Sequence, residues 1–212
     1  MSYRTTRSLA ALAVTAVAAG SALAVGPAQA SSLDDRSLAT VLAADGNHLD
    51  RNWDDFDILD KAVHAVLAAD PGSPVAVLAN GDTRLTAFLP TDRAFRRLVF
   101  TLTGKRPATE RATLRAVTSV ADAPTLEKIL LYHVVPGQPI TYRQARMADD
   151  ARLGTALGPK IRVNVIRHRV VKLQDRDFDN ANARVLRSLK DINRGNKQIA
   201  HGINQVLRPI DL

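Results

Sequence analysis

Apolar residues recur at helical spacing early in this chain and alternate at strand spacing late in it, and this order is the strongest constraint on its fold. Across residues 56–67 the apolar side chains repeat every three to four positions, which predicts an amphipathic helix of about 13 residues that ends at Pro71-Gly72. Across residues 161–165 apolar and polar side chains alternate, as in a half-buried strand. Helices first and strands last predict an α+β domain rather than alternating βαβ units.

The same patterns place the remaining elements. We expect helices at 38–44, 110–120 and 122–132, a loop at 101–109, and strands at 161–166, 170–173 and 198–207. Asn80-Gly81-Asp82 separates two short apolar runs at 75–79 and 84–88, which predicts a β-hairpin. Another helix should begin after Pro90, with Thr91 as its cap and Asp92 near the positive end of its dipole.

Residues 1–30 have the three-part pattern of a secretion signal. Arg4 and Arg7 are followed by an apolar run at 9–25 and by the small-residue site Ala28-Gln29-Ala30, so we expect cleavage after Ala30. The alternative is a membrane anchor, but the apolar run is short for a span of about 20 residues. With no later apolar run and no cysteine for lipid attachment, we expect a secreted protein without stable membrane insertion.

Beyond the signal we expect a polar lead-in at 31–46 and one domain at 47–212. The chain has no cysteine, which excludes disulfides, thiol catalysis and thiolate metal sites, so the stability of the domain must come from its core. The wealth of alanine and arginine is typical of a bacterium with GC-rich DNA. The chain is therefore interpreted as a bacterial secreted protein.

Charge is distributed unevenly along the chain. Residues 31–70 carry nine acidic and three basic side chains, whereas residues 140–212 carry seven acidic and fifteen basic ones. A basic half facing outward favours anionic partners such as cell-wall acids or acidic polysaccharides. The alternative is a solvated charged surface, because the basic residues are interspersed with aspartates rather than clustered.

No catalytic or metal-binding motif stands out among the titratable residues. His64 and Asp60 are four positions apart on one helix, which indicates an ion pair rather than two metal ligands. Asp54, Asp55 and Asp57 lack the alternation and the distant glutamate of a calcium loop, and are interpreted as the solvated start of a helix. The acidic turn at 175–180 contains Arg176, which opposes a bound cation. We therefore expect no enzyme activity, metal or cofactor.

Three stretches, in order, resemble the fasciclin domain family. Residues 86–95 read TAFLPTDRAF, residues 130–137 read LLYHVVPG, and residues 201–209 read HGINQVLRP. They are similar to the family's first motif, its L-L-Y-H-V-V-P-G core and its closing H-x-I-D-x-V-L-x-P strand. The resemblance spans about residues 47–209. It departs from the family before His201, where Asn196 is followed by lysine rather than glycine, and at 99–120, where a longer helical insertion is expected.

The resemblance implies a fold in which N-terminal helices pack on a C-terminal wedge or sandwich of short strands. The motif residues it singles out as structural or binding candidates are Thr91, Asp92, Tyr132, His133 and His201. His133 continues the apolar stripe of its helix, so we expect a buried, neutral imidazole bonded to another element, while Tyr132 should lie nearer the surface. In animal fasciclin proteins the Tyr-His pair is linked to integrin-mediated adhesion.

The function expected from export and from the resemblance is a non-enzymatic module for cell adhesion or extracellular binding. Its partner would be a cell-surface protein or polysaccharide, with no specific nucleic acid, and it would be extracellular or held on the cell wall. Two alternatives stay open. One is carriage of a small apolar ligand between helices and sheet, and the other is electrostatic binding of anionic cell-wall polymers.

Overall fold

The computed structural model describes residues 34–46, 48–177 and 180–209, which belong to one compact unit. The predicted secretion signal at 1–30 lies outside these residues. Among the described residues, no helix has the length and apolar character needed to cross a bilayer.

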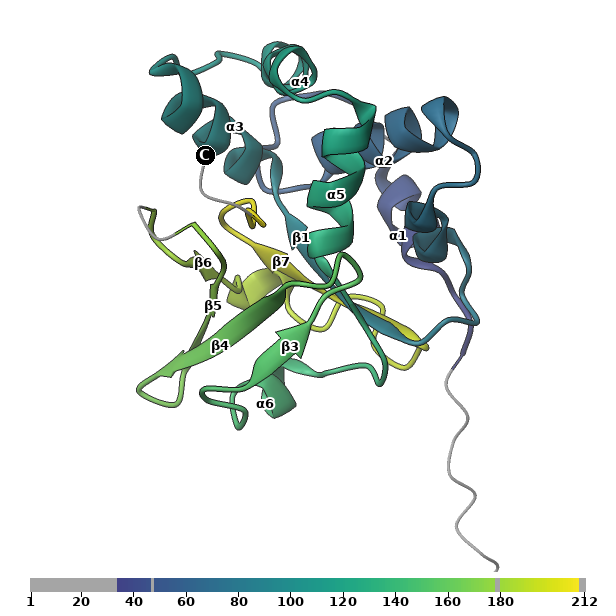
Figure 1. The fold of residues 1–212 in the computed structure, drawn as a ribbon, viewed down its shortest axis with the longest axis vertical. Helices are drawn as coiled ribbons and strands as arrows, with labels where there is room; N and C mark the ends of the chain where they lie inside the picture. Colours follow the sequence, from purple (N-terminus) through teal and green to yellow (C-terminus); the bar gives the residue numbers. More distant parts are fainter. Residues whose placement is uncertain (1–33, 47, 178–179, 210–212) are drawn as a thin grey trace, which may run out of the picture. The chain divides into compact units, whose positions relative to one another are not determined.

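Helices dominate the first part of the unit and strands the second, as expected for an α+β domain (Figure 1). The α-helices are α1 (Leu38–Leu42), α2 (Asp57–Ala69), α3 (Asp92–Thr103), α4 (Glu110–Val120), α5 (Ala123–Tyr132) and α6 (Tyr142–Ala145). The described residues also contain the short 3-10 helices η1 (Ala43–Asp45), η2 (Pro74–Ala79) and η3 (Arg187–Leu189). The strands are β1 (Leu85–Pro90), β2 (Val134–Pro136), β3 (Arg152–Gly154), β4 (Lys160–Ile166), β5 (Val170–Gln174), β6 (Ala183–Arg184) and β7 (Gln198–Ile203).

Two sheets carry the strands. The first has the order β2-β1-β7, with β1 antiparallel to β2 and parallel to β7, and the second is the antiparallel meander β3-β4-β5-β6. Every residue of β1 and of β7 is buried. Because neighbouring side chains on a strand point to opposite faces, the first sheet is covered on both sides.

The two faces of β1 contribute to two different cores. Leu85, Ala87 and Leu89 pack among the helices, whereas Phe88 packs with residues of the second sheet such as Ile161 and Leu173. The unit therefore has three layers, with α2–α5 on one side of the first sheet and the four-stranded sheet on the other (Figure 1). This matches the helix-on-strand architecture that the family resemblance implied.

Local sequence signals set several helix ends. The Asp122 carboxylate accepts a hydrogen bond from the amide of Thr125 at the start of α5, and the Thr109 hydroxyl accepts one from Ala112 at the start of α4. Gly104 ends α3 in the left-handed conformation with φ +69°. These signals lie within a few residues of the helices they bound, so the bounds of α4 and α5 agree with the sequence prediction.

The predicted β-hairpin around Asn80-Gly81-Asp82 is wrong. Residues Pro74–Ala79 form η2, begun by Ser73, whose hydroxyl accepts a hydrogen bond from the amide of Val75. The strand that follows pairs with β2 and β7 instead of with its neighbour in sequence. The predicted loop at 101–109 is also shorter than expected, because α3 runs to Thr103.

The segment before residue 47 is packed into the unit instead of lying on its surface. Leu38 and Leu42 of α1 belong to the helical core, and the amide of Leu38 donates to Oε1 of the buried Gln198. Nε2 of Gln198 donates to the carbonyls of Val77 and Asn80, so one side chain joins α1, η2 and β7. The segment at 34–46 thus contributes to the fold itself.

Candidate functional site

Thr91 and Asp92 lie at the junction between β1 and α3, and both are buried. Thr91 occupies the N-cap position predicted for it, but its side chain makes no capping hydrogen bond. Asp92 instead serves a different helix, because its Oδ1 accepts a hydrogen bond of 3.0 Å from the amide of Ile58 in the first turn of α2. The first family motif therefore joins two helices at their N-termini.

Tyr132 and His133 lie where α5 ends and β2 begins. His133 is buried, and its Nδ1 donates to the carbonyl of Ile129 while its Nε2 accepts from the amide of Leu207. This confirms the predicted inward-facing, neutral imidazole, and burial lowers the pKa of His133 to about 4. The prediction for Tyr132 is wrong, because its side chain is 0% exposed and packs in the core under the second sheet.

His201 lies on β7 opposite Phe88 of β1 and is buried against the rings of Phe88 and Tyr142. Its Nε2 donates to the carbonyl of Ile140, and its Nδ1 accepts from the amide of Asp191. Burial lowers the pKa of His201. The irregular turn before β7 is built with Gly195 in the left-handed region, φ +95°, two residues before Lys197, where the sequence departs from the family pattern.

All five motif candidates, Thr91, Asp92, Tyr132, His133 and His201, are thus interior residues. They hold the β1, β7 and α5 junctions together by hydrogen bonds within the unit. A partner that docks on the folded surface must be recognised by other side chains.

Basic side chains gather on the outward face of the second sheet, and we call this the basic sheet face. It consists of the outward-facing residues Arg152, Lys160, Arg162, Lys172 and Arg184, with Arg176 immediately after β5. Strand register brings them together, because Arg152 pairs with Arg162 and Lys172 pairs with Arg184. The inward-facing residues between them, such as Ile161 and Val163, fill the second core.

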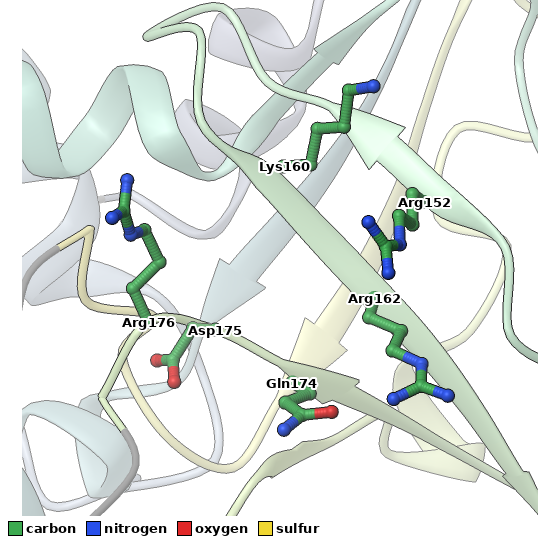
Figure 2. Close-up of a pocket in the computed structure, with 6 residues that line it drawn as sticks. All are labelled: Arg152, Lys160, Arg162, Gln174, Asp175 and Arg176. Carbon is green, nitrogen blue, oxygen red and sulfur yellow. The ribbon is translucent and has the colours of Figure 1, made fainter.

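A shallow groove of about 330 Å³ crosses this face (Figure 2). It is lined by Arg152, Lys160, Arg162, Gln174, Asp175 and Arg176. Arg162 forms an exposed ion pair with Asp150, which screens part of its charge. The Asp175 carboxylate accepts a hydrogen bond from the amide of Arg208, and burial raises the pKa of Asp175. The groove therefore keeps an excess of positive charge from arginine and lysine.

A second hollow, of about 350 Å³, lies between α3, α4 and α5, and its lining is almost entirely apolar. Phe95 and Leu98 line it from α3, Val117 and Val120 from α4, and Leu126 from α5. Val120 and Leu102, at its edge, are exposed. The hollow is within the size range of small-molecule sites. We call it the apolar groove.

The model of the fasciclin domain family matches residues 60–209 of this chain. This match covers more than half of the sequence and includes all three motifs. The chain belongs to the fasciclin domain family. Fasciclin domains are in general non-enzymatic domains with adhesion-type roles. The family assignment made from the three motifs is thereby confirmed, together with the mixed helix-and-sheet fold.

Among solved structures, this fasciclin domain is similar to a FAS1 domain pair from the insect cell adhesion molecule Fasciclin I. The two share 18% sequence identity with a TM-score of 0.43, and the match covers 69% of this chain and 44% of that one. This chain thus spans less than half of the length of the domain pair. A comparison with curated proteins gave no match.

Sequence patterns missed one feature of this fasciclin domain, a cluster of carboxylates from three separate elements. Asp55, Asp92 and Glu110 come together although they are far apart along the chain. The expectation of a solvated helix start is also wrong for Asp57, which is buried. Only Asp54 of that stretch behaves as expected, since it is exposed and paired with Arg93. The spacing of the residues gives no signal for the cluster, because tertiary packing alone assembles it.

Proposed function

We propose that this fasciclin domain is a secreted, non-enzymatic adhesion module that binds anionic polymers of the cell surface through its basic sheet face. The observation that carries the proposal is the alignment of Arg152, Lys160 and Arg162 on neighbouring strands, with Arg176 beside them. Such a face attracts polyanions and releases their counterions on binding. Family membership supports an adhesion role, and the N-terminal sequence pattern supports export.

The geometry favours an extended polymer over a small anion. The cationic groups that line the groove lie on β3, on β4 and past the end of β5, whereas a small anion contacts few groups at a time. A chain of regularly spaced charges contacts them in succession. Because the face is open and its charges are exposed, binding should weaken as salt screens them.

Two measurements test the proposal. Beads coated with residues 31–212 should adhere to cells of the producing organism, and beads with the heat-unfolded protein should not. Immobilised poly(glycerol phosphate) and poly-glutamate should both bind the domain in low salt, and the comparison shows whether phosphate or carboxylate is preferred. Adhesion equal to that of the unfolded protein, or polymer binding that does not depend on salt, would contradict the proposal.

The apolar groove favours a second function, carriage of a small apolar ligand. Its lining from α3, α4 and α5 offers hydrophobic contact, and the exposed Val120 at its edge leaves it open to solution. Native mass spectrometry of the protein purified from its own culture medium tests this function. A ligand-sized mass increment that is lost in a Leu126→Gln variant supports carriage, and a bare protein mass contradicts it.

A further inference from the structure

Three carboxylates from separate parts of the chain meet on the helical side of the domain. Asp55 precedes α2, Asp92 is the first residue of α3, and Glu110 is the first residue of α4. One oxygen of each lies within 4.8 Å of the others. Asp50 and Asp57 form a second group of the same kind around Asp55, so five carboxylates are linked through one residue.

Two members of this carboxylate cluster are fully buried and have oxygens without a hydrogen bond. Asp92 and Glu110 are both 0% exposed. Oδ2 of Asp92 and both carboxylate oxygens of Glu110 have no hydrogen-bond partner among the described residues. A buried ionised carboxylate without a partner is strongly unfavourable, so native proteins pair such groups, bind them to a metal or keep them protonated.

The charged side chains that shift the pKa of these two carboxyls are acidic. The charged neighbours that raise the pKa of Asp92 are Asp55, Asp57 and Glu110. Burial comes first among the causes and raises the pKa of Asp92 to about 8 and that of Glu110 to about 7. The charged side chains that act on the Asp92 and Glu110 carboxyls are therefore all acidic.

Helix capping accounts for only part of the cluster. Oδ1 of Asp92 caps α2 through the amide of Ile58, and helix N-termini favour nearby negative charge. Capping does not explain, however, why Oδ2 of Asp92 and the two carboxylate oxygens of Glu110 are buried without a hydrogen bond. The amide of Asp50 acts on the Glu110 carboxyl and lowers its pKa, but it forms no hydrogen bond of full geometry, and the net pKa shift is upward because burial outweighs it. These oxygens are balanced either by protonation, which the raised pKa values favour, or by a bound cation that holds the carboxylates ionised.

We propose that Asp55, Asp92 and Glu110 bind a divalent cation of the hard, oxygen-preferring class, with calcium as the preferred ion. Carboxylate oxygens within 4.8 Å of one another can all lie at the 2.3–2.6 Å from one ion that is typical of Ca²⁺. Asp50, which is exposed, and Asp57 complete an acidic path to the ion.

The ligand chemistry selects the metal. The cluster offers only carboxylates, with no histidine or thiolate, which disfavours zinc and copper. Magnesium keeps several of its waters and seldom binds in an all-protein cage, whereas calcium accepts six to eight oxygens in flexible geometry. The cation would fix the starts of α3 and α4 against the segment before α2.

Terbium provides a direct probe of the site, because Tb³⁺ replaces Ca²⁺ in oxygen sites and luminesces when a nearby tryptophan is excited. The single tryptophan, Trp53, lies two residues before Asp55. Residues 31–212, freed of metal with EDTA, should show Trp-sensitised Tb³⁺ emission that saturates at one ion per chain. Added Ca²⁺ should displace the terbium, and calorimetry with CaCl₂ should give the same stoichiometry.

Neutral isosteres separate this site from other acidic surface. Glu110→Gln and Asp92→Asn keep the shape of each side chain, and Asp92→Asn keeps the oxygen that caps α2. Each should weaken Ca²⁺ binding by about tenfold or more, because the affinity of such sites follows ligand charge. Glu127→Gln is the matched control, since Glu127 lies on α5 outside both carboxylate groups.

Thermal unfolding keeps the test decisive if a variant folds poorly. In EDTA, Glu110→Gln should melt at or above the wild-type temperature because it removes buried charge, and Ca²⁺ should raise the melting temperature of wild type and of Glu127→Gln only. The proposal would be overturned if no Ca²⁺ binding were found up to about 10 mM, a concentration well above the dissociation constants of extracellular calcium modules. Equal affinity in Glu110→Gln and Glu127→Gln, or binding of Zn²⁺ in place of Ca²⁺, would overturn it as well.

Discussion

Nε2 of His133 accepts a hydrogen bond of 2.9 Å from the backbone amide of Leu207, 74 residues further along the chain. Nδ1 of the same ring lies 2.7 Å from the carbonyl of Ile129, so it carries the proton. The imidazole is thus held as one neutral tautomer between α5 and the segment after β7. Protonation of Nε2 would set its new N–H against the N–H of Leu207.

This relationship predicts an acid-sensitive stability. The pKa of His133 is about 4 in the folded state, compared with about 6.5 unfolded, so between these values the unfolded chain binds more protons and stability falls as pH falls. The contribution of His133 amounts to up to about 3 kcal/mol at neutral pH. Urea unfolding of wild type and of His133→Gln, each from pH 7 to pH 4, measures it.

Other groups titrate in the same range, so the prediction concerns the difference between the two proteins. The stability advantage of wild type over His133→Gln should shrink as the pH falls from about 6.5 to 4. His168→Gln, at an exposed histidine in the β4–β5 turn, should show no such change. A constant advantage of wild type across this pH range would show that His133 does not stay neutral in the fold.

A second prediction concerns the buried ion pair between Asp177 and Arg208. Both side chains are inaccessible, so Asp177→Ala would remove the acidic partner that pairs with the buried guanidinium and would leave Asp175 as a weaker source of negative charge. Removing one partner of a buried pair costs about 3–5 kcal/mol. The double variant Asp177→Ala with Arg208→Met should recover part of this loss in a denaturant titration. If the double variant is less stable than Asp177→Ala alone, the pair is not the source of the cost.

Gly81 provides a prediction about backbone packing. A Cβ at this position would collide with the carbonyl oxygen of Asp35, so Gly81→Ala must push the segment before α1 away from the turn that follows η2. We expect the variant to lose about 1–3 kcal/mol of stability, the usual cost of overpacking. Gly154→Ala is the control, because a Cβ there meets nothing within 4 Å. Thermal melts of both variants test the contact, and equal melting temperatures would refute it.

The basic sheet face predicts a measurable salt dependence. Replacing Arg152, Lys160 and Arg176 by glutamine should weaken binding to poly(glycerol phosphate) on the order of tenfold or more at low salt, and it should flatten the slope of log affinity against log salt. The control replaces Lys105, Arg111 and Arg115, exposed residues around α4, with the same loss of charge. Equal weakening in both triple variants would mean that net charge, and not this face, determines binding.

Local features of this fold were predictable and long-range ones were not. The bounds of α4 were predicted from the sequence as 110–120, and in the structure the Thr109 hydroxyl caps the start of this helix. The prediction of a hairpin around Gly81 was wrong because β1 pairs in parallel with β7. A local sequence pattern does not identify so distant a partner strand. Tyr132 was expected near the surface because the pattern of α5 marks only one covered side, whereas the four-stranded sheet covers the other.

The candidate sites show the same division. The alternation in 161–165 was enough to place Arg162 on an outward face, but the register that sets Arg152 beside it comes from strand pairing. Glu110 was recognised only as the start of a helix, because nothing in the sequence relates it to Asp92. The cluster depends on how three helix N-termini are packed, and that packing is a property of the whole fold.

The parallel pairing of β1 with β7 has a consequence for how the protein is made. Leu85 pairs with Gln198, so the central sheet joins residues more than one hundred positions apart. During synthesis, β1 is made long before β7. Until β7 is available, one edge of β1 is unpaired and one of its apolar faces is exposed, since the helices cover only the other face. Folding of such long-range pairs is slow. A nascent chain arrested before Gln198 is therefore a target for chaperones and proteases, even if its helices have already formed.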